Sequence, residues 1–215
     1  MSHDAWQLRA ARCYDDATFG GRPELVVEGE RELDVVEADL ALARGKLLHA
    51  RFLDGRVNRD ERELPLFELA VELYGKLGER AKLAEALFWV GCCHQVVLDD
   101  EATALEHFHA SYDLAAELGE DVIRSYAVRH LGFAALSTGE LDLAETRFDE
   151  SLRLRRDAGA PAATVAAAII PLAVLAEQRG DLGRAGHLFA EATRIAEDNR
   201  AVGVLDWIER ARAGS

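Results

Sequence analysis

The chain has 215 residues, of which 49% are hydrophobic and 30% are charged, and it contains only 4 prolines. This composition is typical of a globular protein with a sizeable core, and it excludes a disordered or fibrous chain. The 25 basic and 39 acidic residues give a net charge of −14. Such a surface repels phosphate backbones and anionic headgroups, so we expect neither nucleic acid nor a membrane as a direct partner.

The N-terminal segment lacks the basic residues and the apolar core of a signal peptide. The longest apolar stretch, Val165 to Ala176, contains Pro171 and is much shorter than a bilayer span. The three cysteines, two of them adjacent at positions 92 and 93, do not form a disulfide framework. We therefore expect a cytoplasmic protein.

Helical patterns cover nearly the whole chain. Residues 4–38 look helical with a break at Gly20 to Pro23, so residues 1–38 are predicted to form degenerate N-terminal helices. Four helix pairs are predicted over 39–198: 39–54 with 62–77, 80–97 with 101–118, 122–138 with 141–157, and 162–179 with 182–198. A last helix at 201–213, with Val202, Leu205, Trp207 and Ile208 on one side, is predicted to cap the array.

An internal repeat sets the period of these pairs. Phe67, Phe108, Phe148 and Phe189 are separated by 41, 40 and 41 residues. A small residue lies three positions after each Phe, and another lies four positions before each of the last three. These spacings place the small residues and the Phe on one stripe of a helix. The small residues are Ala70, Ser111, Ser151 and Ala192 after the Phe, and Ala104, Ala144 and Ala185 before it. A partner helix is therefore predicted to approach closely beside each Phe.

A second pattern lies upstream of each of the last three phenylalanines, where a large apolar residue precedes a small one: Val90-Gly91, Leu131-Gly132 and Leu172-Ala173. Turn residues followed by acidic residues separate the two patterns. Carboxylates stabilise the N-terminus of a helix through its dipole, so a second helix is predicted to begin there. The repeated unit is thus a helix, a tight turn and a second helix.

These two motifs resemble the tetratricopeptide repeat over roughly residues 40–200. The period exceeds the family's usual length of about 34 residues, and the proline that commonly ends the second helix is missing. Gly78 and Gly119 occupy that place, and glycine is a good helix terminator. The resemblance implies an all-α fold, a right-handed superhelix of about four helix pairs in one domain over residues 1–215.

The resemblance also implies a concave groove lined by the first helix of each pair. Its positions carry over by alignment on Gly45, Gly91, Gly132 and Ala173. They give Leu42, Lys46 and His49; Phe88, Cys92 and Gln95; Tyr126, Arg129 and Phe133; and Ile170, Val174 and Glu177. Aromatic residues and an arginine among apolar residues are typical of binding surfaces.

The composition of the groove restricts its ligand. Tetratricopeptide arrays that bind the terminal carboxylate of a peptide use several Lys, Arg and Asn residues at these positions. In this groove only Lys46 and Arg129 are basic and no Asn is present, so we do not expect the groove to bind a terminal carboxylate. A partly apolar peptide, an amphipathic helix or a small apolar molecule fits better. The alternative is that Phe88, Phe133 and Ile170 only pack between neighbouring helices.

No catalytic or metal-binding motif occurs. Cys92, Cys93 and His94 are consecutive on a helix and cannot converge on one ion, and His107 and His109 lie on nearly opposite faces. Phosphate-binding glycine loops and an esterase elbow are absent as well. We expect no catalytic residues, no metal and no cofactor.

Three functions follow from these patterns. The leading hypothesis is a non-enzymatic scaffold that binds a protein or peptide in the groove. The alternative is a small-molecule sensor or an unusual enzyme with a pocket around Phe88, Cys92, Tyr126 and Arg129, together with His94 or His130. A third interpretation is self-association into a homo-oligomer through an incompletely capped end.

Overall fold

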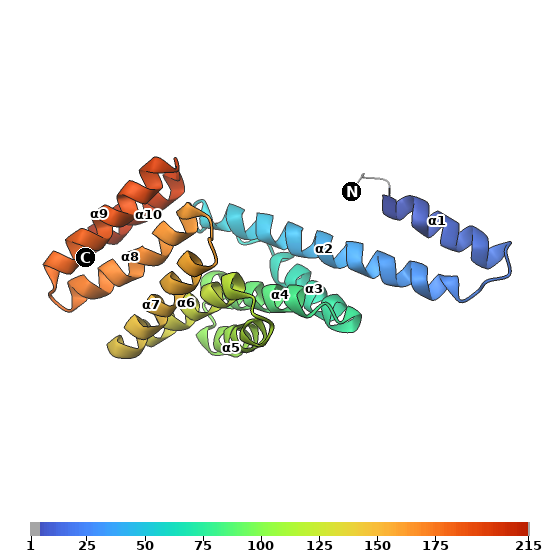
Figure 1. Ribbon diagram of the computed structural model, residues 1–215, viewed down its shortest axis with the longest axis horizontal. Helices are drawn as coiled ribbons and strands as arrows, with labels where there is room; N and C mark the ends of the chain where they lie inside the picture. Colours follow the sequence, from blue (N-terminus) through green and yellow to red (C-terminus); the bar gives the residue numbers. More distant parts are fainter. Residues whose placement is uncertain (1–4, 215) are drawn as a thin grey trace. The chain divides into compact units, whose positions relative to one another are not determined.

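A computed structural model describes residues 5–214, and every regular element in that range is helical. The fold class is therefore all-α, as predicted. The elements are α1 (Ala5–Thr18), α2 (Leu25–Leu53), α3 (Glu63–Leu77), α4 (Arg80–Cys92), the π-helix η1 (Cys93–Leu98), α5 (Glu101–Leu118), α6 (Asp121–Ser137), α7 (Leu141–Asp157), α8 (Ala162–Gln178), α9 (Leu182–Asp198) and α10 (Val202–Ala213) (Figure 1).

The chain divides into two compact units, which meet in the sequence at Asp100 and Glu101. Unit 1 contains α1 to η1, and unit 2 contains α5 to α10. Within each unit, helices that follow one another in the chain pack side by side. The superhelical hand and the single solenoid over residues 1–215 stay predictions.

The N-terminal part of unit 1 differs from its prediction. The break at Gly20 to Pro23 is confirmed, because α1 ends at Thr18 and α2 begins at Leu25. However, α2 continues to Leu53, so the first helix of the first pair does not begin at residue 39. No proline interrupts α2, and α1 folds back along its first half (Figure 1). Residue 4, the predicted helix start, lies outside the described range.

The repeat motif has a direct packing explanation. A Cβ atom added to Gly132 in α6 would lie 2.6 Å from Cε1 of Phe148 in α7. In unit 1 a Cβ atom at Gly45 would lie 2.5 Å from Cε1 of Phe67. Both distances are shorter than any ordinary carbon contact. The glycine of the first helix is therefore the socket for the phenylalanine of the second, in the first pair as well as in the third.

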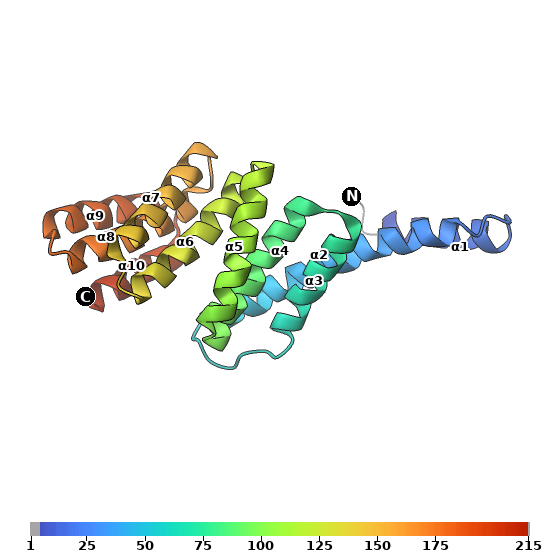
Figure 2. The ribbon, with the colours of Figure 1, turned by 90° about the horizontal axis from the view of Figure 1, so that it is seen from below.

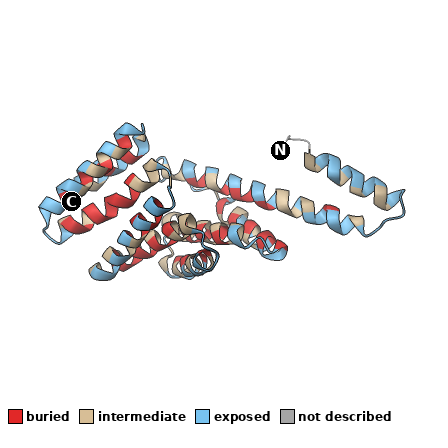
Figure 3. Ribbon diagram, in the orientation of Figure 1, coloured by how far each residue is buried: buried red, intermediate tan, exposed pale blue. Residues whose placement is uncertain are grey.

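Unit 2 follows the prediction closely. The bounds of α7 and α9 are as predicted, and those of α6 and α8 differ by one residue. Phe108, Ala144 and Phe148 are fully buried, as expected from the repeat. The hairpins α6/α7 and α8/α9 pack on each other through α7 and α8 (Figure 2), and α8 is buried along most of its length (Figure 3).

The last helix packs on the core with two of its four predicted residues, because Ile208 is buried and the half-buried Leu205 packs against the same cluster. Helix α10 contacts both α8 and α9, and it buries Val204 and Ile208 in the core of unit 2. Val202 and Trp207 are 65% and 43% exposed. The core-facing stripe thus runs through positions spaced by four, and Val202 and Trp207 lie beside it.

The predicted helix over residues 80–97 is not a uniform α-helix. Its last turn and a half, Cys93–Leu98, is a π-helix, and Asp99 follows in the left-handed region with φ 57°. By length and composition alone, Arg80–Leu98 is also the one described stretch that could cross a membrane. In unit 1 its Ala86, Val90 and Cys93 belong to the core.

Candidate functional site

The twelve residues predicted to line the groove are all at least partly buried. Five of them are buried, namely Leu42, His49, Phe88, Cys92 and Ile170. The other seven are half-buried, namely Lys46, Gln95, Tyr126, Arg129, Phe133, Val174 and Glu177. Half-burial is the exposure expected of residues that line a shallow groove, so these seven are the stronger candidates.

In unit 2 the predicted surface joins the first helices α6 and α8. Arg129 of α6 donates a long hydrogen bond, 3.5 Å, from Nη2 to the carbonyl oxygen of Ala167 in α8. Its guanidinium carbon lies 4.7 Å from the ring centroid of Phe133, which is within cation–π range. Arg129 therefore lies on the side of α6 that faces α8.

The α8 part of this surface ends at a carboxylate. Ile170 is buried in the core, and Val174 packs against the same cluster from its half-buried position. One turn further, Oε2 of Glu177 is buried and accepts no hydrogen bond from any described residue. A buried carboxylate oxygen without a donor is costly unless a water or a ligand supplies one. We call Arg129, Phe133, Val174 and Glu177 the first-helix face.

In unit 1 the corresponding surface is occupied by its own ion pairs. Leu42 and Lys46 line a pocket of about 190 Å³ between α2, α3 and α4. Lys46 Nζ lies 2.6 Å from Oε1 of Glu85, and Lys82 Nζ lies 2.7 Å from Oδ1 of Asp39. These four charged residues all line the pocket, so its lining is electrically balanced.

His49 points into the core of unit 1. Its Nδ1 lies 2.8 Å from Oε1 of Glu63 in α3, and both side chains are buried. The Trp89 ring packs edge-on against the imidazole at 5.5 Å. Because it is buried, His49 does not lie on the groove surface proposed from the sequence. Its polar ring is accommodated in the core by Glu63, a partner that the sequence pattern did not indicate.

Cys93 completes this buried cluster. Burial, and then the negative charge of Glu63 and a hydrogen bond with it, raise the pKa of the Cys93 thiol to about 12. A thiol that stays protonated is a poor nucleophile. All three cysteines of the chain are free. Among the described residues, no group of three His, Cys, Asp or Glu side chains is arranged to hold a metal ion.

The residues of the suggested small-molecule pocket are placed unit by unit. In unit 1, Phe88 and Cys92 are buried, and His94 Nδ1 lies 3.3 Å from Oδ2 of Asp100. In unit 2, the Tyr126 ring lies under the guanidinium of Arg155 at 4.6 Å. The His130 ring contacts Phe108 with a centroid distance of 4.8 Å. Tyr126 and His130 thus both make ring contacts within unit 2.

Comparison with known proteins identifies the fold only. No family model and no curated protein sequence matches the chain. Among solved structures, the chain is similar to the crystal structure of BtubC (BKLC) from P. vanneervenii, with a TM-score of 0.51 and 14% sequence identity. The match covers 91% of this chain and 92% of that one. The chain has an all-helical fold of repeated helical hairpins.

Proposed function

We propose that this protein is a cytoplasmic scaffold of the tetratricopeptide-like class, which binds a protein or peptide on its first-helix face and catalyses no reaction. The glycine sockets that receive Phe67 and Phe148 support the class, because they give the two repeat motifs one shared packing role. The net charge of −14 supports a polypeptide partner over nucleic acid.

The observation that carries the proposal is the first-helix face of unit 2. It combines half-buried apolar side chains with a carboxylate oxygen of Glu177 that no described residue satisfies. A peptide backbone N–H or a basic side chain supplies the missing donor, and Phe133 and Val174 supply apolar contact. The partner is therefore a partly apolar segment that carries a hydrogen-bond donor beside an apolar anchor.

A selection experiment tests this function without a known partner. A random peptide library is displayed on phage and selected against the immobilised full-length protein, and the enriched peptides are synthesised. Calorimetry then compares their affinity for the wild type and for Glu177→Gln. We expect the variant to bind about tenfold more weakly, because a charged acceptor of a hydrogen bond is lost.

The matched control is Glu197→Gln, which removes the same charge from an exposed position on the second helix α9. It should bind the selected peptides like the wild type. Peptides that bind Glu177→Gln as tightly as the wild type, or a library that yields no saturable binder, would refute the proposal.

A further inference from the structure

Unit 2 contains a second pocket that none of the predicted groove residues lines. It has a volume of about 380 Å³ and lies where the C-terminal ends of α7 and α9 meet the N-terminal end of α8. Its lining combines three arginines with aliphatic side chains, one carboxylate and one amide: Arg155, Arg156, Arg194, Ala160, Ala162, Val165, Ile195, Asp198 and Asn199. Three arginines in one pocket stand out in a chain with a net charge of −14.

Arg155 is a buried cation without a carboxylate partner. It is only 4% exposed. Its Nε donates to Ser125 Oγ at 3.3 Å, and its Nη1 donates to the carbonyl oxygen of Thr164 at 2.6 Å. The Tyr126 ring lies 4.6 Å from the guanidinium carbon. All of these partners are neutral, and burial lowers the pKa of Arg155 to about 10.

A buried charge without a counterion is unfavourable, and an anion that enters the pocket would compensate it. The second terminal nitrogen of Arg155, Nη2, donates to none of the described residues, and Arg155 is one of the residues that line the pocket. Half of the guanidinium fork is thus held by the protein, and the other half is available to a ligand.

The other two arginines can turn toward a ligand at little cost. Arg156 pairs with Glu191 at 2.7 Å and Arg194 pairs with Asp198 at 3.2 Å, and all four side chains are substantially exposed. Exposed pairs of this kind contribute little to stability. The N-terminus of α8 has no side-chain cap, so its first amides add partial positive charge beside Ala162.

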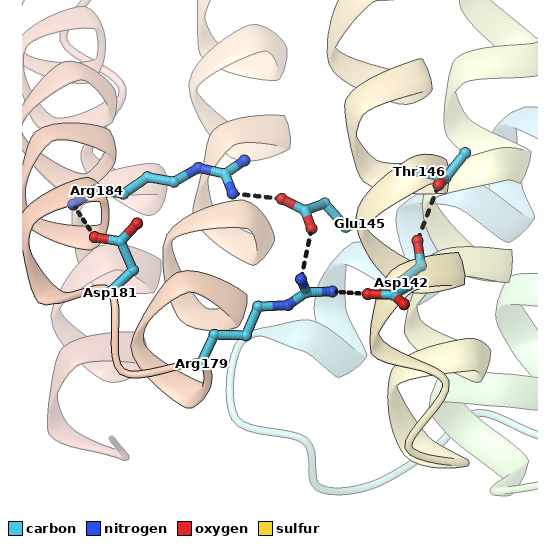
Figure 4. Close-up of polar contacts among 6 residues, drawn as sticks. All are labelled: Asp142, Glu145, Thr146, Arg179, Asp181 and Arg184. Atoms are coloured by element: carbon cyan, nitrogen blue, oxygen red, sulfur yellow. Dashed lines mark hydrogen bonds and ion pairs between the residues drawn. The ribbon is translucent and has the colours of Figure 1, made fainter.

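The opposite ends of the same helices show how arginines are usually neutralised in unit 2. Arg179, at the end of α8, lies between Asp142 and Glu145 of α7, with its Nη2 2.6 Å from Asp142 Oδ1 and its Nη1 3.2 Å from Glu145 Oε2 (Figure 4). Arg184 of α9 pairs with the other oxygen of Glu145. Carboxylates thus saturate that end, whereas Arg155 has none.

We propose that this pocket binds a carboxylate that carries a short aliphatic group. The carboxylate lies between Arg155 and Arg194, where Nη2 of Arg155 donates to one of its oxygens and the guanidinium of Arg194 donates to the other. The aliphatic group contacts Val165 and Ile195, and the pocket volume suffices for one small side chain. Both a free acid and the C-terminal residue of a peptide present this chemistry. This site does not depend on the first-helix face.

Titration of the ¹⁵N-labelled full-length protein tests the pocket. The probes are N-acetylvaline, its uncharged amide, inorganic phosphate, and a blocked tetrapeptide that ends in valine. We expect N-acetylvaline to shift the amide signals of residues 162–165 and 194–199 saturably, and the uncharged amide to have no effect. Phosphate should bind more weakly, and a tighter tetrapeptide would identify the source as a peptide C-terminus.

The repeat provides a matched control variant. Arg153 lies 41 positions before Arg194, and it forms the same exposed pair with the residue four positions later, at 3.4 Å from Asp157. It does not line the pocket. Arg194→Gln should weaken the binding of N-acetylvaline about tenfold, whereas Arg153→Gln should bind it as tightly as the wild type does. Arg155→Lys, which loses the fork, should abolish saturable binding.

Several results would overturn the proposal, and none of them requires Arg155 variants to fold. They are the absence of saturable shifts with N-acetylvaline, equal shifts with its amide, tighter binding of phosphate, and equal affinities of Arg194→Gln and Arg153→Gln. Loss of the peptide binding tested with Glu177→Gln would not affect these results, so the two proposals fail separately.

Discussion

Gly132→Ala tests the packing that the repeat motif encodes. An exposed glycine inside a helix normally costs about 1 kcal/mol relative to alanine, so the substitution alone should stabilise α6 by that amount. At Gly132, however, the new methyl group would lie 2.6 Å from Cε1 and 2.7 Å from Cδ1 of Phe148. The Phe148 ring is fully buried and packs edge-on against Phe133 at 5.1 Å, so it has little room to retreat.

Overpacking of a core typically costs about 1–3 kcal/mol. After the gain in helix propensity of about 1 kcal/mol is subtracted, Gly132→Ala should lower the free energy of unfolding by up to about 2 kcal/mol, and it should not raise it. Gly186→Ala in α9 is the control, because an added Cβ atom there meets nothing within 4 Å. It should raise the free energy of unfolding by about 1 kcal/mol.

Urea unfolding followed by circular dichroism at the helix band measures both variants. A third variant, Gly132→Ala with Phe148→Leu, should recover part of the loss, because a smaller side chain leaves space for the new methyl group. If Gly132→Ala stabilises the protein as much as Gly186→Ala, the socket has no energetic role and the packing explanation of the repeat is wrong.

Four further predictions concern individual side chains. Phe148→Ala should lower the free energy of unfolding by about 3–5 kcal/mol, because it empties a fully buried site; a loss below about 1 kcal/mol in the same urea assay would contradict the register. Arg129→Ala should weaken the selected peptides by about 1.5–3 kcal/mol in calorimetry, with Arg129→Lys restoring part of it; unchanged affinity would exclude Arg129 from the binding surface. The half-buried Cys13 should react with iodoacetamide at pH 8.5 before the buried Cys93, as followed by mass spectrometry. Because the folded pKa of Cys93 is raised to about 12 from 9.0, its contribution to stability should be complete below pH 9 and decline between pH 9 and 12.

The sequence predicted what depends on local spacing. The Phe, Ala and Gly positions recur with a helical period, so they located the second helices and the core residues Phe108, Ala144 and Phe148. Turn glycines marked the helix ends well, because Gly78 and Gly119 both adopt the left-handed conformation that ends a helix, with φ of 73°.

The sequence did not predict contacts between residues that are far apart in the chain and that lie outside the repeated motifs. His49 and Glu63 are 14 residues apart across an irregular connection, and no spacing rule relates two residues separated in this way. The alignment with the tetratricopeptide repeat therefore placed His49 on the groove surface, although its ring is buried. The repeat pattern did not indicate the arginine pocket for a similar reason, because its residues come from the ends of three helices and two of its arginines lie at the end of α7, a second helix.

The π-helix at Cys93–Leu98 accounts for an irregularity in the repeat length. From the first residue of α4 to the first residue of α5 the chain advances 21 positions, whereas the steps from α6 to α7 and from α8 to α9 are 20. A π-helical turn holds more residues than an α-helical turn, so it takes up the surplus residue inside the helix. The extra residue lies between two core motifs, and Val90 and Phe108, on either side of it, are both buried. Within this chain the repeat length therefore varies by one residue without loss of burial at the motif positions on either side.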